Sequence, residues 1–297
     1  MLLSKRMRDI VAGYLFLLPA LAAFLSFIAI PLGYALYLSF TEYNMMKPAA
    51  FVGFKNWTAF INDSRVAVVY GNTLKYALIL VPVHVVFGLL LALGVNHVKS
   101  EIGKYVFRTG FYFPVLVTTA SVAIAWRYMF ERDFGVINYI LGLLGGSPVN
   151  WLNSEKWVFV SVAIFSLWKF VGNNFLFFLI GLQNIPDSLY DASKIDGTNR
   201  LQNLLYITLP LLTPTTFFVI IHLLIGVIQI FDEPFLITGG GPGDASNSIA
   251  TYIYEVAFRQ FEMGYASLIS LTLFVILIVI TFIQIRMGNR WVHYDQE

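Results

Sequence analysis

The residues best suited to chemistry lie inside two long apolar stretches. In the first, four residues recur at i, i+3, i+4 and i+7, the spacing of one helix face: Ser166, Lys169, Phe170 and Asn173. An unpartnered ammonium in an apolar helix costs about 3 kcal/mol on insertion scales. Lys169 is therefore predicted to face a wet cavity or a carboxylate such as Asp232 or Glu233. A contact with an anionic solute and a structural ion pair both fit the sequence.

The second apolar stretch carries a matching polar stripe. At about 100° per residue, four residues fall within about 60° of one another on one helix face: His222, Gly226, Gln229 and Glu233. Asp232 lies next to them. Two such stripes in successive helices predict a shared, water-accessible centre through which a substrate passes. Hydrogen bonding between packed helices is the competing interpretation, because polar residues often serve that purpose in membrane bundles.

The composition indicates that lipid is the main solvent. Hydrophobic residues make up 58% of 297 residues and charged residues 12%, and the mean hydropathy is +0.73. A soluble domain has no need for so much apolar surface. The net charge of +2 is too small to suggest nucleic-acid binding, and without cysteine no disulfide or thiolate site is available.

Six stretches are long enough to cross a hydrocarbon core, which takes roughly 20 helical residues. They are approximately Val11–Leu38, Thr73–Val95, Gly110–Phe130, Val158–Leu182, Leu209–Leu236 and Tyr265–Ile285. The sequence thus predicts an all-α membrane protein with six transmembrane helices. Prolines inside the spans predict kinks that neighbouring helices tolerate: Pro19, Pro31, Pro82 and Pro114.

The distribution of Lys and Arg predicts the orientation. The loops on the side of the termini are the shorter ones, and in short loops the excess of positive charge marks the cytoplasm. We therefore expect both termini and the loop 184–210 to be cytoplasmic. The apolar run after the basic N-terminus is too long for a signal peptide, which predicts an uncleaved first span.

The segment Asp191–Pro210 is the most polar long stretch between apolar ones, and it has the composition of two short helices around a turn. Ser188 and Asp191 have the spacing of a capping box. Asp196-Gly197 is a turn dipeptide whose glycine can adopt the positive φ that ends a helix. The pattern predicts a helical elbow that lies on the membrane face.

This elbow resembles the cytoplasmic signature loop of ABC-importer permease subunits, the binding-protein-dependent transport system inner-membrane component family. The family pattern is Glu-Ala-Ala, three residues, Gly, nine residues, Ile, one residue, Leu-Pro; here Asp191 replaces the Glu and Ser193 the second Ala. The resemblance implies a coupling helix that docks on an ATPase subunit. The implied ATPase-coupling residues are Asp191, Ala192, Ser193, Ile195, Asp196, Gly197, Leu209 and Pro210.

A later segment resembles the carbohydrate-uptake (maltose-type) branch of the same family. Gly239-Gly240-Gly241-Pro242 is followed by Tyr254-Glu255, Phe258 and Gly264-Tyr265-Ala266, in the order found in that branch. The resemblance also places the stripe around Trp168 at sugar-lining positions. Lys169 and Phe170 depart from the small or apolar residues of the maltose case, so the same sugar contacts are not implied.

The resemblance implies a type I ABC-importer permease fold and a division of the chain into three parts. These are an N-terminal helix with an extracytoplasmic loop (1–71), a five-helix core with the coupling loop (72–287) and a cytoplasmic tail (288–297). It also implies a multi-pass protein of the bacterial cell membrane. The implied partners are a second permease subunit, two cytoplasmic ABC ATPases and an extracytoplasmic solute-binding protein.

The expected function is passage of a carbohydrate, with no catalysis by this chain. It has no Gly-x-x-x-x-Gly-Lys-Ser/Thr loop, serine elbow or His-Glu-x-x-His helix, and its histidines are scattered, so we expect no catalytic residue, bound cofactor or metal site. ATP and Mg²⁺ would be bound by the partner ATPases. An anionic solute, such as glycerol-3-phosphate or a uronate oligosaccharide, is the alternative. A secondary transporter is less favoured because the acidic residues lie near span ends.

Overall fold

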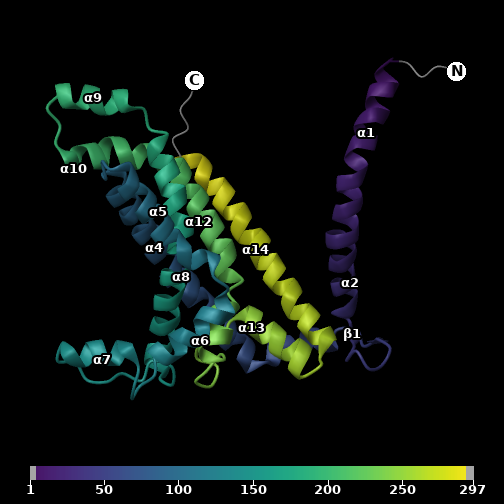
Figure 1. Cartoon of the computed structure of the whole chain (residues 1–297). Coiled ribbons are helices and arrows are strands. Elements are labelled where there is room, and N and C mark those ends of the chain that lie inside the picture. Colours follow the sequence, from purple (N-terminus) through teal and green to yellow (C-terminus); the bar gives the residue numbers. More distant parts are fainter. Residues whose placement is uncertain (1–4, 292–297) are drawn as a thin grey trace. The chain divides into compact units, whose positions relative to one another are not determined.

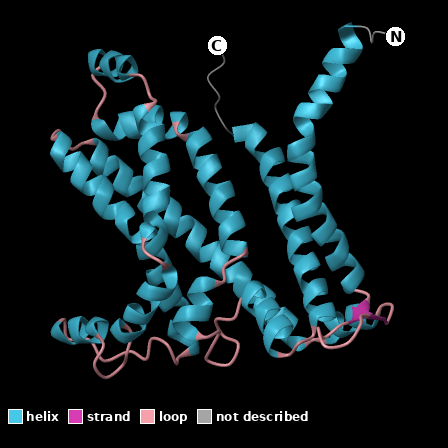
Figure 2. Ribbon diagram, turned by 45° about the vertical axis from the view of Figure 1, so that its right-hand side comes forward, coloured by secondary structure: helices cyan, strands magenta, loops and turns pink. Residues whose placement is uncertain are grey.

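The computed structural model describes residues 5–291 and is helical along most of its length (Figure 1). Four single helices are long and apolar enough to cross a membrane, and two bent helix pairs raise the number of candidate spans to as many as six. The described residues contain one small ribbon, in which the strands β1 (Thr41–Glu42) and β2 (Ala50–Phe51) pair antiparallel (Figure 2). The described residues form two compact units, 5–63 with 253–274 and 64–252 with 275–291.

The first unit begins with the helical run α1 (Lys5–Phe24), η1 (Leu25–Ala29) and α2 (Ile30–Leu38). It contains the candidate span Ala12–Leu38. Pro19 and Pro31 do not interrupt the run, although a π-helical turn precedes Pro31. The ribbon and the amphipathic helix α3 (Lys55–Asn62) follow.

In the first unit, hydrogen bonds to main-chain carbonyls hold α3 against the start of the ribbon. The Asn56 side chain donates to the carbonyls of Ser39 and Thr41 at 3.0 and 2.9 Å. At the start of α14 (Met263–Trp291), Gly264 approaches the same region so closely that a Cβ there would lie 2.0 Å from the Thr41 carbonyl oxygen. A glycine is therefore required in the Gly264-Tyr265-Ala266 motif.

The second unit contains the helices that follow, as far as Tyr252, together with the part of α14 that begins at Val275. Its first elements are α4 (Ser64–Asn96), α5 (Glu101–Leu116), α6 (Thr119–Met129), α7 (Val136–Leu143) and α8 (Glu155–Gln183). The elbow follows as α9 (Asp187–Ile195), α10 (Arg200–Asn203), η2 (Leu204–Thr208) and α11 (Leu209–Leu211). The chain continues through α12 (Thr213–Ile228), η3 (Pro234–Thr238), α13 (Ile249–Tyr254) and η4 (Glu255–Arg259).

The core of the second unit forms where α4 and α12 pack along α8. Leu80 of α4, Phe175 and Phe178 of α8 and Leu212 and Val219 beside them are fully buried. The helix α5 packs against α8 at Gly172, where an added Cβ would lie 2.3 Å from the Phe111 carbonyl oxygen. The close approach of two backbones is thus set by the absence of one side chain.

Three predicted spans differ from the observed helices. The helix α4 begins at Ser64, not near Thr73, because the Gly71-Asn72-Thr73 sequence continues the helix and its polar side chains bond to a distant loop. Pro114 lies within α5, and the break comes after it, at Val117 and Thr118, which are both extended; α5 and α6 meet at 96°.

The predicted fifth span ends early, because α12 stops at Ile228 and the chain up to Phe231 is not helical. The helix 200–211 also bends by 62° from α12. Pro82, by contrast, lies inside an unbroken α4. The three-part division 1–71, 72–287 and 288–297 stays a prediction, and residues 292–297 of the expected tail lie outside the described residues.

The elbow lies at one end of the second unit. Figure 1 shows α9 and α10 at the end where α14 finishes, while α7 lies at the opposite end. The two ends are separated by the length of α8, whose 29 residues are enough to cross a hydrocarbon core.

We predict that Gly172→Ala destabilises the protein, because the new methyl group forces α5 away from α8. Overpacking of this kind costs about 1–3 kcal/mol and should lower the midpoint of thermal unfolding of the detergent-solubilised protein. Gly94→Ala in α4 is the matched control, because nothing lies within 4 Å of its Cβ position and alanine is the better helix former. Equal midpoints for the two variants would contradict the proposed packing constraint.

Candidate functional site

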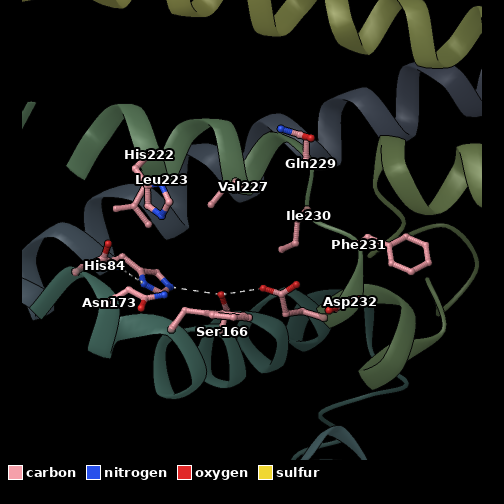
Figure 3. Close-up of a pocket in the computed structure, with 14 residues that line it drawn as sticks. His84, Ser166, Asn173, His222, Leu223, Val227, Gln229, Ile230, Phe231 and Asp232 are labelled. Carbon is pink, nitrogen blue, oxygen red and sulfur yellow. Dashed lines mark hydrogen bonds between the residues drawn. The ribbon is translucent and has the colours of Figure 1, made fainter. Parts of the chain in front are cut away.

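A cavity of about 350 Å³ lies between α4, α8, α12 and the non-helical segment that follows α12 (Figure 3). Its volume is within the range of small-molecule sites, about 300–1,000 Å³. The lining residues are His84, Ser166, Phe170, Asn173, Asn174, His222, Leu223, Gly226, Val227, Gln229, Ile230, Phe231, Asp232 and Glu233.

The cavity brings together most of the residues that the two polar stripes predicted. Those that line it are Ser166, Phe170, Asn173, His222, Gly226, Gln229, Asp232 and Glu233. Four polar side chains form a buried wall: His84, Ser166, Asn174 and Glu233, each at most 8% exposed. His222, Gly226, Gln229 and Asp232 form an exposed rim.

Hydrogen bonds connect the buried wall into one chain. The Ser166 hydroxyl donates to Glu233 Oε1 at 3.2 Å and lies 3.4 Å from Nε2 of His84. The other ring nitrogen of His84 lies 3.1 Å from the Asn174 amide nitrogen. The dashed lines in Figure 3 follow this path from His84 through Ser166. Three separate segments of the chain are therefore joined by polar side chains in an apolar interior.

The prediction that Gln229 and Glu233 share a helix face with His222 was wrong. The helix ends at Ile228 because Gln229 leaves the helical conformation, and Glu233 reaches the cavity from the next short helical segment. The residues still meet because the non-helical segment folds back over the cavity. Periodicity identified the right residues, although the geometry that unites them is different.

Lys169 does not line the cavity, and its ammonium has other partners. It is 1% exposed, and Nζ donates to the carbonyl oxygens of Pro114, Val115 and Val117 at 2.6, 3.2 and 2.5 Å. These carbonyls belong to the end of α5, where the helix break leaves acceptors without intrahelical donors. A cation is also favourable at a helix C-terminus. Lys169 therefore contacts the C-terminal end of α5, and neither the carboxylate nor the wet cavity that the sequence predicted.

The angular position of Lys169 on α8 explains this outcome. At about 100° per residue, Ser166, Phe170 and Asn173 lie close together, whereas Lys169 lies about 60° to one side of Ser166 and Asn174 about 80° to the other. The cavity is centred between Ser166 and Asn174, so Lys169 points past its edge toward α5. Asn174 was missed in the sequence although it lies at i+8 from Ser166, and His84 carried no positional signal.

Polar side chains hold the glycine-rich loop (239–243) against the first three turns of α4. Arg65 binds both carboxylate oxygens of Asp244, at 2.7 and 2.8 Å, and the guanidinium holds the pKa of Asp244 below its usual range. Asn72 donates to the carbonyls of Asp244 and Asn247. Gly239, Gly240 and Gly243 have positive φ angles, which glycine adopts without strain.

The elbow consists of the two short helices that the sequence predicts. Gly197 has φ +76° between α9 and α10. The capping box lies at Asn199 and Gln202 instead of at Ser188 and Asp191, because Pro186 is the residue that precedes α9. Asp191 instead pairs with Lys194 at 2.9 Å on the exposed surface.

Internal hydrogen bonds stiffen the elbow and leave its outer face open. Buried Ser193 donates to the Tyr190 carbonyl, and its own carbonyl accepts from Thr198. The Tyr190 hydroxyl is bonded to Thr208 across the turn. Ala192, Asp196 and Gly197 are exposed, Leu209 and Pro210 are half-buried, and Ile195 is 88% exposed.

Comparison with known proteins decides the family. Residues 84–292 match the family described as "Binding-protein-dependent transport system inner membrane component". The chain belongs to this family. It is 35% identical over 295 residues to the probable ABC transporter permease YesP of Bacillus subtilis, covering 98% of this chain and 94% of that protein. It is 33% identical over 286 residues to the arabinooligosaccharide transport permease AraP of the same organism, covering 94% and 88%.

The fold of this permease also occurs in a solved transporter. A bacterial alginate ABC transporter, crystallised in complex with an alginate pentasaccharide-bound periplasmic protein, contains a chain with a TM-score of 0.83, 23% identity and 96% coverage of both chains. At this identity the likeness shows the fold alone, and it confirms a type I ABC-importer permease fold. The family consists of membrane permease subunits and not of ATPases.

We predict that Lys169→Met destabilises the permease, because it removes the buried donor that serves three carbonyls of a half-buried helix end. Loss of such charge-assisted hydrogen bonds costs about 1–3 kcal/mol, so the midpoint of thermal unfolding should fall by several degrees and transport should be lost with it. Lys47→Met, on an exposed loop, is the control and should leave the midpoint unchanged. A Lys169→Met permease with normal stability and altered solute preference would show instead that the ammonium serves the cavity.

Proposed function

We propose that this chain is the transmembrane permease subunit of an ATP-driven importer that admits a carbohydrate delivered by an extracytoplasmic binding protein. The supporting observation is a cavity with a buried polar wall inside an apolar bundle, in a chain that carries a stiff exposed elbow at one end. Polar residues at this depth are expensive and mark solute pathways. The name of AraP, an arabinooligosaccharide permease, supports a carbohydrate as the solute.

In this proposal the chain crosses the membrane six times, and each bent pair counts as one span. An even number of spans brings both termini to the same side, which the short basic loops indicate is the cytoplasm. The elbow then faces the cytoplasm and α7 faces the outside of the bacterial cell membrane. The remaining subunits are a second permease, two ATPases that bind ATP and Mg²⁺, and the binding protein.

The elbow is the proposed handle by which the ATPases move the permease. The Thr198 hydroxyl donates to the Ser193 carbonyl across the turn, and the hydrogen bond between the Tyr190 and Thr208 hydroxyls connects α9 to η2. A segment with these internal hydrogen bonds moves as a rigid body when a partner displaces it. Closure of the ATPases on ATP would move the elbow and rock the bundle between inward- and outward-facing states, a rigid-body transition.

The docking surface on the elbow is predicted to be apolar and centred on Ile195. An 88% exposed isoleucine at the tip of a polar helix is the kind of side chain that fills a pocket on a partner. Exposed Leu201 and Tyr206 on the second half of the elbow extend the apolar surface.

We predict that Gly197→Pro uncouples ATP hydrolysis from uptake, because proline cannot adopt φ +76°. The assembled complex should still reach the membrane and hydrolyse ATP while solute uptake falls at least tenfold. Gly145→Pro is the matched control, because Gly145 has φ +79° and equally open surroundings at a distance from the elbow. Ala192→Trp should resemble Gly197→Pro. Full uptake by the Gly197→Pro complex would count against the elbow as the coupling element.

A second prediction concerns subunit assembly. Ile195→Glu should lower the amount of ATPase that copurifies with the permease by roughly tenfold, because a charge must be desolvated on docking. Ile61→Glu, on an 80% exposed isoleucine of α3, is the control. Equal recovery of the ATPase with both variants would place the contact elsewhere.

Reconstitution tests the function as a whole. Vesicles that contain the complete complex and its binding protein should accumulate labelled oligosaccharide only when ATP is supplied to the ATPases. Accumulation by this chain alone, without nucleotide or the other subunits, would overturn the proposal.

A further inference from the structure

The hydrogen-bond chain along the buried wall has a direction. An ionised Glu233 can only accept hydrogen bonds, so the single Ser166 hydrogen is directed to its Oε1. Ser166 then accepts from a protonated Nε2 of His84, which leaves Nδ1 as an acceptor for the Asn174 amide. The hydrogens of Ser166 and of His84 Nε2 are thereby used within the wall, and one of the two Asn174 amide hydrogens is used as well.

Acceptor atoms of the buried wall remain without a hydrogen-bond donor. Asn174 Oδ1 is buried and has no hydrogen-bond partner, in a side chain that is 1% exposed and lines the cavity. Native proteins leave few buried polar atoms unpaired, so such an atom in a cavity wall points to a ligand that supplies the missing donor. The Glu233 carboxylate, with up to four acceptor sites, and the Asp232 carboxylate add further acceptors beside it.

The charge of the cavity agrees with its hydrogen-bonding character. Two carboxylates line it, whereas no Lys or Arg does among the described residues. Lys169, the basic residue of the polar stripe on α8, does not line the cavity, and its ammonium donates to carbonyl oxygens at the end of α5. A carboxylate, phosphate or sulfate in the cavity would therefore meet the carboxylate of Asp232 and find no Lys or Arg among the lining residues to bind it.

The geometry points to a solute that is rich in donors and carries no negative charge, namely a neutral oligosaccharide or an amino sugar, with uronates and sugar phosphates rejected at this wall. The inference rests on the proposed function and narrows its substrate class. It also separates this permease from an importer of the same fold that was crystallised with an alginate-loaded protein.

The test measures the binding of three oligosaccharides to the assembled complex. Saturation-transfer NMR on the assembled complex in nanodiscs, without binding protein, would use an equimolar mixture of maltotriose, a glucosamine trimer and a uronic acid trimer. We expect the maltotriose and glucosamine signals to exceed the uronate signal at least tenfold. In the Asp232→Asn, Glu233→Gln double variant, which keeps the shape of both side chains, the uronate signal should rise at least tenfold.

Controls make each outcome decisive. Asp133→Asn, which removes an exposed carboxylate that is not part of the cavity lining, should leave the three signals unchanged. Asn174→Leu should weaken the maltotriose signal and leave the uronate signal low. A uronate signal equal to that of maltotriose, a uronate signal unaffected by the double variant, or no signal from any probe would overturn the inference. Failure of the proposed function is separately visible, as absence of ATP-dependent uptake of any of the three probes in vesicles with the binding protein.

Discussion

A polar group inside an apolar bundle must find its partner within the protein, because the hydrocarbon core contains no water to replace it. The break between α5 and α6 would leave half-buried carbonyl oxygens without intrahelical donors. Lys169 meets this requirement with three hydrogen bonds to the end of α5. The same bonds satisfy the ammonium, which is otherwise the most expensive group in α8. The break and the lysine are therefore each tolerable only in the presence of the other.

The helix α8 is the central element of the second unit, because α4, α5 and α12 all pack against it. One edge of it carries Lys169 to the broken helix, and the opposite edge carries Ser166 and Asn174 to the cavity. Gly172 allows α5 to approach closely on the first side. Because these contacts fix the rotation of α8, they also fix which of its polar residues face the cavity. A lysine that the sequence places on the same helix face as Ser166 is thereby kept out of the cavity lining.

The two functional regions of the permease are built on different physical principles. The cavity is formed from side chains that meet across several helices, and one of them reaches it from a non-helical connection. The elbow is formed locally, with Tyr190, Ser193, Thr198 and Thr208 bonded to one another within a few turns of chain. Local bonding gives a stiff unit that can be moved as a body, whereas long-range bonding gives a site that changes when the helices move.

The sequence by itself determined the membrane class, the approximate spans, the elbow with its turn at Gly197 and most of the polar residues around the cavity. These depend on hydropathy, on 3.6-residue periodicity and on local turn chemistry, all of which act over short stretches of chain. Tertiary structure alone decided that α12 ends before Gln229, that His84 and Asn174 complete the wall, and that Lys169 binds carbonyls and not a carboxylate. The physical reason is that a buried polar side chain takes whichever partner packing brings within reach. The identity of that partner depends on helix rotation and on breaks in distant segments, and neither is encoded in the spacing of residues along one helix.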